Sequence, residues 1–458
     1  MGKLFGTNGI RGVTNEELTP ELAMRMGKSI GTYFGEGKKI LIGRDVRAGG
    51  DMIIRAVESG LMASGEIVTY AGVLPTPALQ FNVKAAGFDA GVMITASHNP
   101  PEFNGIKVIG KDGIEIDSSE EDKIESIYFK NDMNPVNWKK LTTDIHTYEN
   151  SIKDYVSGVV KHVNKAQISK RRLKVLIDGA NSVGSITTVA IAKELGCQIY
   201  EINTKLDPLM SSRKPEPTPE TLIKTAEISV RLGVDITVAH DGDADRAIFI
   251  DSKGKVQFGD RSGALLAGWL ASKEKKLPRR VFAPIASSPL IEEYLNEFNV
   301  KTIWTKIGPM FISRALINDG GIAGIEDSGG FMYPEHQPVR DGGMAFAIMV
   351  EMLSNHDEDS STLFSTLPMY HTQKLKVSAS RSTNMKSIIE KIKEKYSGNG
   401  TVDDIDEDGL KFVGNGYWFI VRKSGTEPVI RITTEAKDNS EAKSISDKLK
   451  GLVEENLG

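Results

Sequence analysis

Short apolar runs alternate with segments of helical periodicity along most of the chain, and one such unit occurs three times. In each copy a basic pair precedes an apolar strand, which is followed by a loop of small residues, a helix and a second strand that ends near a proline. The copies begin at Lys38-Lys39, Arg171-Arg172 and Arg279-Arg280. Strands that alternate with helices in this way are typical of βαβ units in a mostly parallel sheet. The pattern predicts three similar α/β domains, either from an internal repeat or because α/β units resemble one another in any protein.

The C-terminal part of the chain follows a different pattern. Residues 387–396 and 440–455 have helical periodicity, and the segment YWFIVRKSGTEPVIRITTEA between them predicts two strands around a tight polar loop. A polar, acidic run at 355–363 lacks apolar periodicity and predicts a domain boundary. The expected fold class is α/β, with three similar α/β domains of mixed, mostly parallel sheets and a smaller α+β domain. The expected domains cover residues 1–148, 149–252, 253–361 and 362–458.

Composition excludes several classes of protein. The chain has 458 residues, 57 basic and 61 acidic side chains, and a net charge of −4, so no basic excess favours nucleic acid or a membrane surface. Cys197 is the only cysteine, which excludes an intrachain disulfide and fits a reducing compartment. The N-terminus has no apolar signal core, and the apolar stretches 264–271 and 344–353 fall short of the ~18 residues of a membrane span. We therefore expect a cytoplasmic protein in which these two stretches are buried helices.

A polar loop follows the apolar strand that ends at Thr95. Asn99-Pro100-Pro101 blocks both helix and ladder, and Asn104-Gly105 is a turn signal, so we expect Ser97 on a sharp, exposed loop at a strand's carboxyl end. His98 and Lys107 flank it. A serine in this setting can be a nucleophile activated by a neighbouring base and cations. The alternative is a polar connecting turn.

A second polar loop contains three carboxylates at a spacing of two residues. Asp241, Asp243 and Asp245 lie between two apolar strands and can converge on one hard cation. An EF-hand is excluded because its sixth position would be Arg246 rather than Gly and its twelfth Ser252 rather than Glu. A solvated acidic turn is the alternative, but strands on both sides make close carboxylates costly without a cation.

Two further loops offer groups for binding sugar and phosphate. Glu326 and Ser328 lie in a glycine-rich segment that suits sugar hydroxyls or is simply a turn. The C-terminal hairpin contains Arg422, Ser424 and Thr426, with Arg431 beyond them. The guanidinium and the two hydroxyls can bind phosphate. The alternative is a hairpin with charged residues along its rim. The segment 179–185 has Walker-like glycine spacing, but Ser185 stands where the lysine must be, so ATP use is not supported.

The motifs FGTNGIRG, GRDVR, TASHNPPEFNGIK, DGDADR, the E-x-S-G of Glu326–Gly329 and RKSGTEP occur in this order over nearly the whole chain. In these motifs the sequence resembles the α-D-phosphohexomutase superfamily of phosphoglucomutases, phosphomannomutases and phosphoglucosamine mutases, in particular its archaeal members. The resemblance implies four domains around a central cleft, each contributing one loop. It implies a phosphomutase that interconverts hexose 1-phosphate and hexose 6-phosphate through a phosphoserine and a 1,6-bisphosphate.

The resemblance also implies roles for individual residues. Ser97 becomes the phosphoserine, and its phosphate completes a site for one Mg²⁺ with Asp241, Asp243 and Asp245. Glu326 and Ser328 become the readers of the sugar hydroxyls. The remaining matched positions lie near the transferring group (Arg11, His98, Lys107 and Arg246) or in the clamp on the non-reacting phosphate (Arg422, Ser424, Gly425 and Thr426), and we add Gly308 and Arg431 as substrate-binding residues.

The sequence departs from the family pattern at two points. Many relatives have His after E-x-S-G, where this chain has Gly330, and many have Gly-His or Gly-Asp where it has Gly308-Pro309. The segment EHQPVRDGG is similar to archaeal members, which often accept more than one sugar. We expect mannose or glucose phosphates as substrates, with phosphoglucosamine as the alternative and a metal-dependent serine phosphatase as a distant one. We expect sugar phosphates as partners and a hexose 1,6-bisphosphate as activator. We expect no nucleic-acid or membrane partner. The expected oligomeric state is a monomer or a homodimer.

Overall fold

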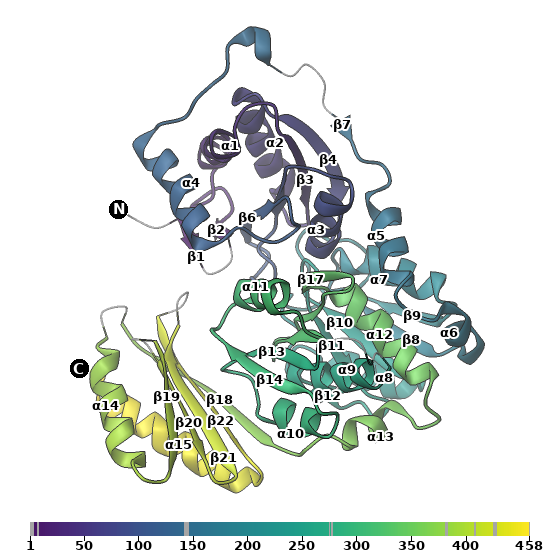
Figure 1. Ribbon diagram of the computed structural model, residues 1–458, viewed down its shortest axis with the longest axis vertical. Coiled ribbons are helices and arrows are strands. Elements are labelled where there is room, and N and C mark those ends of the chain that lie inside the picture. Colours follow the sequence, from purple (N-terminus) through teal and green to yellow (C-terminus); the bar gives the residue numbers. More distant parts are fainter. Residues whose placement is uncertain are drawn as a thin grey trace.

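The computed structural model describes residues 4–457 except for 7–8, 142–145, 274, 276–277, 381–382, 407–408 and 425–427. The described chain forms four β-sheets that follow one another along the sequence, each with its own helices (Figure 1). The first three sheets contain parallel strands, and the fourth is antiparallel. The predicted architecture, three α/β domains followed by an α+β domain, is confirmed.

The first sheet has seven strands in the order β1-β2-β6-β5-β3-β4-β7. Its strands are β1 (Phe5–Gly6), β2 (Gly9–Val13), β3 (Lys39–Arg44), β4 (Ile67–Val73), β5 (Ala90–Ile94), β6 (Phe103–Gly110) and β7 (His146–Thr147), and its helices are α1 (Pro20–Phe34), α2 (Gly50–Ala63), α3 (Thr76–Ala85) and α4 (Ser118–Lys130). The short 3₁₀-helix η1 (Trp138–Lys140) follows α4. Helix α1 begins where the Thr19 side chain accepts the Leu22 amide at 3.3 Å and Pro20 fixes the first turn. It ends at Gly35, whose φ of 88° favours glycine.

The second and third sheets repeat the parallel core of the first. The second has the order β12-β11-β10-β8-β9 and the third the order β14-β13-β15-β16-β17. The second contains β8 (Lys174–Asp178), β9 (Gln198–Ile202), β10 (Ile236–His240), β11 (Ala247–Ile250) and β12 (Val256–Gln257), with α5 (Ser151–Val160), α6 (Lys165–Arg171), α7 (Gly184–Glu194) and α8 (Ile223–Leu232). The third contains β13 (Arg280–Pro284), β14 (Lys301–Thr305), β15 (Ala323–Ile325), β16 (Phe331–Tyr333) and β17 (Gln337–Arg340), with α9 (Gly259–Lys273), α10 (Leu290–Asn296), α11 (Pro309–Asp319), α12 (Gly342–Ser354) and α13 (Ser360–Ser365). Strand β12 extends the second sheet beyond residue 252, where we placed the end of that domain.

The recurring unit of the sequence corresponds to three parallel strand pairs. These are β3–β4, β8–β9 and β13–β14, each of which begins at or shortly after the basic pair. The helices between the paired strands are α2, α7 and α10, which differ by a few residues at their ends from the expected helices at 52–64, 187–195 and 290–298. The stretches 264–271 and 344–353 lie in α9 and α12 and are buried almost throughout, as predicted. None of the helices in the described part of the chain is long and apolar enough to cross a membrane.

The fourth sheet has the order β18-β22-β21-β20-β19, and with its own helices it forms a unit apart from the other domains (Figure 1). It contains β18 (His371–Ser378), β19 (Gly400–Asp406), β20 (Gly409–Gly414), β21 (Tyr417–Lys423) and β22 (Val429–Ala436), with α14 (Met385–Tyr396) and α15 (Asn439–Glu455). It has its own apolar core around Phe412 and Phe419. By contrast, one cluster of buried apolar side chains passes through the first three domains, from Met93 through Val238 to Phe346. The first three domains therefore form one packed body, and the site lies where their strand-end loops meet.

Candidate active site

Ser97 follows the carboxyl end of β5 in a left-handed backbone conformation, with a φ of 53°. Its amide donates to the Thr95 hydroxyl at 2.9 Å, and that hydroxyl donates to Asp45 Oδ2 at 2.6 Å. A non-glycine residue in this region of φ is uncommon and is kept there only by surrounding contacts. The turn that presents Ser97 is therefore held by a chain of hydrogen bonds from β3.

A buried ion pair between Asp45 and Arg47 stabilises this loop. Arg47 Nε lies 3.0 Å from Asp45 Oδ2, and neither side chain is exposed. The guanidinium also donates to the backbone oxygen of Ser97, and to those of Pro100 and Phe103 at 2.7 and 3.1 Å. Burial raises the pKa of Asp45, and the charge of Arg47 opposes that shift. One arginine therefore anchors three carbonyls of the serine loop.

Ser97 itself is buried, with 1% of its surface exposed, and our expectation of an exposed loop is wrong. The cause is a turn of the second domain that packs against it. Ser97 Oγ donates to Asp241 Oδ2 at 2.8 Å, and a Cβ placed on Gly242 would lie 2.4 Å from the Ser97 backbone oxygen. The glycine in the acidic turn is thus required for this close approach.

The acidic turn connects the antiparallel strands β10 and β11. Asp241, Asp243 and Asp245 are all buried, and their carboxylate oxygens lie within 4.8 Å of one another. The Oδ1 atoms of Asp243 and Asp245 make no hydrogen bond within the described residues. An all-oxygen donor set with orphaned buried atoms fits a hard divalent cation.

The three carboxylates of this turn are too close together and too deeply buried to be all ionised without a nearby positive charge. Burial, followed by repulsion from Asp243 and Asp245, raises the pKa of Asp241 well above its usual value. Burial likewise raises the pKa of Asp245. Burial alone would raise the pKa of Asp243 too, but Lys107 and the Thr76 hydroxyl lower it below its ordinary value. A bound cation would stabilise the fully ionised turn.

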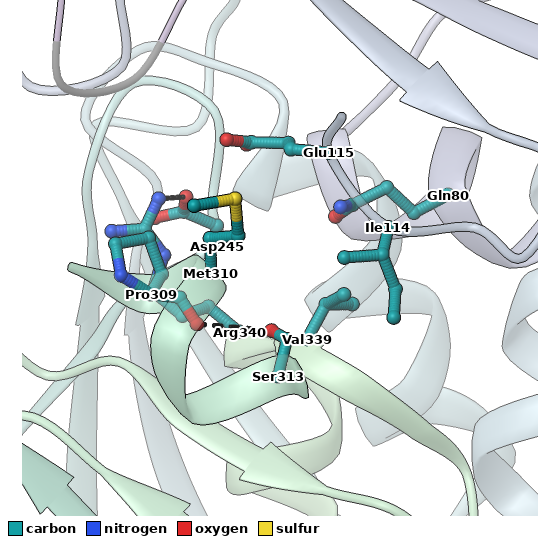
Figure 2. Close-up of a pocket in the computed structure, with 9 residues that line it drawn as sticks. All are labelled: Gln80, Ile114, Glu115, Asp245, Pro309, Met310, Ser313, Val339 and Arg340. Carbon is teal, nitrogen blue, oxygen red and sulfur yellow. Dashed lines mark hydrogen bonds and ion pairs between the residues drawn. The ribbon is translucent and has the colours of Figure 1, made fainter. Parts of the chain in front are cut away.

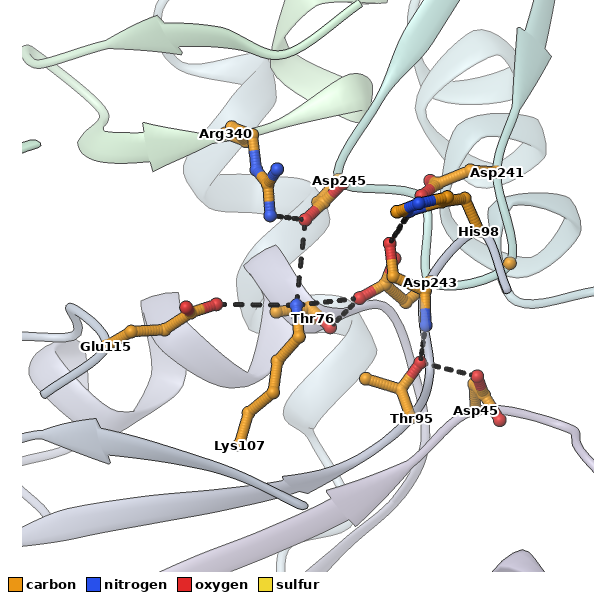
Figure 3. Close-up of polar contacts among 12 residues, drawn as sticks. Asp45, Thr76, Thr95, His98, Lys107, Glu115, Asp241, Asp243, Asp245 and Arg340 are labelled. Atoms are coloured by element: carbon orange, nitrogen blue, oxygen red, sulfur yellow. Dashed lines mark hydrogen bonds and ion pairs between the residues drawn. The ribbon is translucent and has the colours of Figure 1, made fainter. Parts of the chain in front are cut away.

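Cationic side chains lie beside the turn, among them Lys107 and Arg340 (Figure 3). Lys107 Nζ, 1% exposed at its side chain, lies 3.2 Å from Asp243 Oδ2, 3.8 Å from Asp245 Oδ2 and 3.3 Å from Glu115 Oε1. Arg246 Nε lies 3.9 Å from oxygens of both Asp241 and Asp245. These fixed positive charges partly offset the negative charge of the three carboxylates.

His98 and Arg11 complete this side of the site. His98 Nδ1 lies 3.5 Å from Ser97 Oγ, and the nearby charge of Arg246, burial and Arg11 together lower the pKa of the imidazole. Arg11 donates to the Asn99 side chain, and burial lowers its pKa. The lowered pKa favours the neutral imidazole, which can accept a hydrogen bond.

The glycine-rich loop of the third domain is joined to the acidic turn by backbone contacts. Ala247 N donates to Gly329 O at 3.0 Å, and Arg246 and Gly330 form an isolated β-bridge. Glu326 is buried, and its Oε2 lies 3.7 Å from Arg340 Nη1, whereas Ser328 is half-buried. The sequence-predicted sugar reader therefore lies next to the predicted metal turn.

A cavity between the first and third domains opens beside these groups (Figure 2). Glu115 faces Asp245 and Arg340 across it, and Pro309 and Ser313 of α11 form part of its wall. Gly308, at the N-terminus of α11, has a φ of 137°, which favours glycine at this bend. The third-domain residues thus border the same space as the acidic turn.

The fourth-domain residues lie on the hairpin of β21 and β22. Gly425 and Thr426 lie outside the described residues. Ser424 N donates to Val429 O at 2.9 Å at the base of the hairpin. Arg422 and Arg431 are directly opposite each other in the antiparallel register. Like charges directly opposite each other repel across a strand pair, and acidic neighbours such as Asp327 or a bound anion offset that repulsion.

Several residues that shape the site escaped the sequence reasoning. Asp45 and Arg47 belong to the GRDVR motif, yet nothing in its local pattern gave them a role. Thr76, at the start of α3, donates to Asp243 Oδ2 at 2.6 Å. Arg340 Nη2 lies 2.5 Å from Asp245 Oδ2. The sequence shows these four residues only as charged or hydroxyl residues near strand ends and helix starts. Such residues are also common at protein surfaces without a functional role.

Comparison with known proteins identifies the family. Models of the phosphoglucomutase/phosphomannomutase family match in order: alpha/beta/alpha domain I at residues 2–135, domain II at 153–254, domain III at 258–370 and the C-terminal domain at 375–452. The chain belongs to the phosphoglucomutase/phosphomannomutase family. The resemblance read from the motifs is confirmed, and with it the enzyme class, a phosphomutase.

Individual members of the phosphoglucomutase/phosphomannomutase family align over the whole chain. A phosphoglucosamine/phosphogalactosamine mutase of Sulfurisphaera tokodaii is 51% identical over 99% of this chain and 100% of its own. A phosphoglucomutase/phosphomannomutase of Thermococcus kodakarensis is 37% identical over 100% of both chains. A crystal structure of a family protein from Burkholderia thailandensis has a TM-score of 0.87 at 24% identity and covers 99% of this chain and 97% of its own, which shows a shared fold.

Proposed function

We propose that this phosphomutase interconverts hexose 1-phosphates and hexose 6-phosphates through a phosphate carried on Ser97. The observation that carries the proposal is the buried contact between Ser97 Oγ and Asp241 Oδ2 at 2.8 Å. It brings the hydroxyl that would be phosphorylated against the acidic turn that would hold Mg²⁺. A polar connecting turn needs no such partner, and neither does a solvated acidic turn.

The residues of the site divide the chemistry among them. Asp241, Asp243 and Asp245 would hold Mg²⁺, which would offset negative charge on the phosphoryl oxygens. Lys107 and Arg246 add fixed positive charge beside the same position, and phosphoryl transfer depends chiefly on such placement and neutralisation. Water is excluded because Ser97 and the acidic turn are buried.

The transfer balances without any further reactant. The sugar hydroxyl oxygen forms a bond to phosphorus as the bond between phosphorus and Ser97 Oγ breaks, and the hydroxyl proton ends on Ser97. The resulting 1,6-bisphosphate turns around and returns its other phosphate to Ser97. In either orientation Glu326 and Ser328 would bind sugar hydroxyls. Arg422, Ser424, Gly425 and Thr426, with Arg431, would hold the phosphate that does not react, and Gly308 would border the substrate.

Two substrate classes have specific support. The 51% identical relative is a phosphoglucosamine/phosphogalactosamine mutase, which favours amino-sugar phosphates. The 37% identical relative is a phosphoglucomutase/phosphomannomutase, which favours glucose and mannose phosphates as the second class. Both fit one site because the clamp would bind phosphate rather than a particular hydroxyl pattern.

The direct test is incubation with glucosamine 6-phosphate, glucose 1-phosphate or mannose 1-phosphate in separate reactions with Mg²⁺ and a trace of hexose 1,6-bisphosphate. Isomerised sugar phosphate is the expected product, first with glucosamine 6-phosphate. Release of free phosphate instead would make the chain a phosphatase. Unchanged substrate in all three reactions would contradict a mutase activity on these sugars.

A further inference from the structure

We propose that Arg340 is a positioning residue that joins the metal turn to the sugar loop and occupies the space left by the missing side chain at position 330. This inference rests on the proposed function, because it assigns a metal to Asp245 and a sugar to Glu326. Arg340 ends β17 in the third domain, whereas Asp245 lies in the second. A single side chain therefore links the two loops.

The first support is steric. A Cβ placed on Gly330 would lie 2.4 Å from Glu326 Oε2 and 2.6 Å from Arg340 Cδ. The φ of Gly330 is outside the range that favours glycine, so only space excludes a side chain there. The E-x-S-G motif of Glu326–Gly329 is followed directly by Gly330, which has no side chain. A side chain at position 330 and the observed conformation of Arg340 thus exclude each other.

The second support is the arrangement of charges. Arg340 is 6% exposed, its Nη2 lies 2.5 Å from Asp245 Oδ2, and its Nη1 lies 3.7 Å from Glu326 Oε2. Because Oδ2 of Asp245 is engaged in this way, Oδ1 remains as the oxygen without a hydrogen bond among the described residues. A planar guanidinium presents a rigid fork of donors that orients the carboxylates it contacts, whereas an ammonium is a compact point charge with little directional preference.

These contacts have two opposite consequences. A permanent positive charge next to Asp245 weakens the attraction of the turn for a cation, and strongly so in a buried site. The same contact fixes the orientation of Asp245 and Glu326, on which catalysis depends. Arg340 therefore lowers metal affinity while raising the rate of transfer. A side chain that merely stabilised the fold would not produce opposite signs.

The test compares the parent with Arg340→Met and Arg340→Lys. Mg²⁺ affinity is measured by calorimetry on the dephosphorylated enzyme. The value of kcat/KM is measured separately, at saturating Mg²⁺, with the sugar phosphate that the parent isomerises. Arg340→Met should bind Mg²⁺ several-fold more tightly yet lose roughly 10–100-fold in kcat/KM, the usual cost of removing an outer-shell partner. Arg340→Lys should restore the parental Mg²⁺ affinity but only part of the kcat/KM, because it keeps the charge and loses the fork.

A matched control is Arg261→Met. Arg261 is another buried arginine, bound to Gln257 and to backbone oxygens of Phe364 and Pro368, away from the acidic turn. Its loss should lower the melting temperature and leave both Mg²⁺ affinity and kcat/KM unchanged. A double-mutant cycle tests the steric part: Gly330→His should cost less in an Arg340→Ala background than in the parent, where the remaining cost comes from the contact with Glu326.

The outcomes separate the hypotheses. Unchanged Mg²⁺ affinity and kcat/KM in Arg340→Met would overturn the inference, as would a parallel fall of both. Equal cost of Gly330→His in both backgrounds would overturn the steric part. If the parent itself isomerises no sugar phosphate, the proposed function fails, whereas the Mg²⁺ affinities of the variants still decide whether Arg340 acts on Asp245.

Discussion

The hydroxyl of Ser97 donates to the carboxylate of Asp241 at 2.8 Å, although 144 residues separate them in the chain. The contact joins the strand-end loops of two domains and leaves both residues buried. It places the hydroxyl that would carry the phosphate beside the turn that would hold the metal.

Asp243→Asn should cut catalysis sharply while the fold persists. The substitution removes one carboxylate of the proposed metal site and the charge that pairs with Lys107 at 3.2 Å. We expect kcat to fall by roughly 10²-fold or more, the usual loss for a preorganised charge contact, and Mg²⁺ affinity to weaken. Titration of activity with Mg²⁺ tests this. The control is Asp357→Asn, a fully exposed carboxylate at the surface, and a variant as active as that control at limiting Mg²⁺ would remove Asp243 from the metal site.

Asp45→Asn should destabilise the protein through the loop that carries Ser97. It leaves the fully buried charge of Arg47 without its partner, and breaking a buried ion pair in this way typically costs about 3–5 kcal/mol. Urea denaturation measures the free energy of unfolding. Because Arg47 also binds the Ser97 carbonyl, kcat should fall at temperatures where the variant is still folded. Parental stability and activity together would show that the pair is dispensable.

Much of the fold followed from the sequence, and the site followed only in part. The alternation of apolar strands with helices is a local signal, and it located β3, β8 and β13 after their basic pairs. The motifs placed Ser97 and the three aspartates on loops. The burial of Ser97 could not be predicted, because it depends on a glycine in another domain, Gly242, allowing close packing.

The role of Arg340 was hidden for a related reason. Its position in EHQPVRDGG was visible, but its partners Asp245 and Glu326 are brought to it only by the packing of the second and third domains. Sequence patterns describe neighbours along a helix or strand. They carry no information about which charged side chains meet between domains.

Glu66→Gln should make stability less dependent on pH. Glu66 is buried in the turn between α2 and β4, and burial raises its pKa to about 8. This pKa exceeds the value in the unfolded chain, which is about 4.3. Below about pH 4.3 the carboxyl group is protonated in both states, and its contribution to the free energy of unfolding is fully present. Between about pH 4.3 and pH 8 the free energy of unfolding falls by about 1.4 kcal/mol per pH unit, because the unfolded chain ionises and the folded one does not.

The measurement is the melting temperature of parent and variant at pH 5 and pH 8. The amide of Gln can still accept the hydrogen bond that Lys38 N donates at 2.8 Å, so the two proteins should melt alike at pH 5. At pH 8 the variant should be the more stable. A parent that keeps its full stability between these pH values would contradict the raised pKa.

Arg422→Met should raise KM for monophosphates more than it lowers kcat. Arg422 lies opposite Arg431 across β21 and β22, and the pair would bind the phosphate that does not react. We expect a roughly tenfold or greater rise in KM, since a hydrogen bond to a charged group contributes about 1.5–3 kcal/mol. Steady-state kinetics tests this against Lys448→Met, an exposed cation of the same domain. Equal KM values in the two variants would place the distal phosphate elsewhere.

The central claim is that Ser97 carries the phosphate between the two half-reactions. Intact-protein mass spectrometry of enzyme incubated with hexose 1,6-bisphosphate should show one added phosphate, mapped to the peptide that contains Ser97, and none on Ser97→Ala. The same variant should lose essentially all turnover, because no other group would store the phosphoryl between half-reactions. A Ser97→Ala protein that interconverts the sugar phosphates at a rate near the parental one would contradict the account.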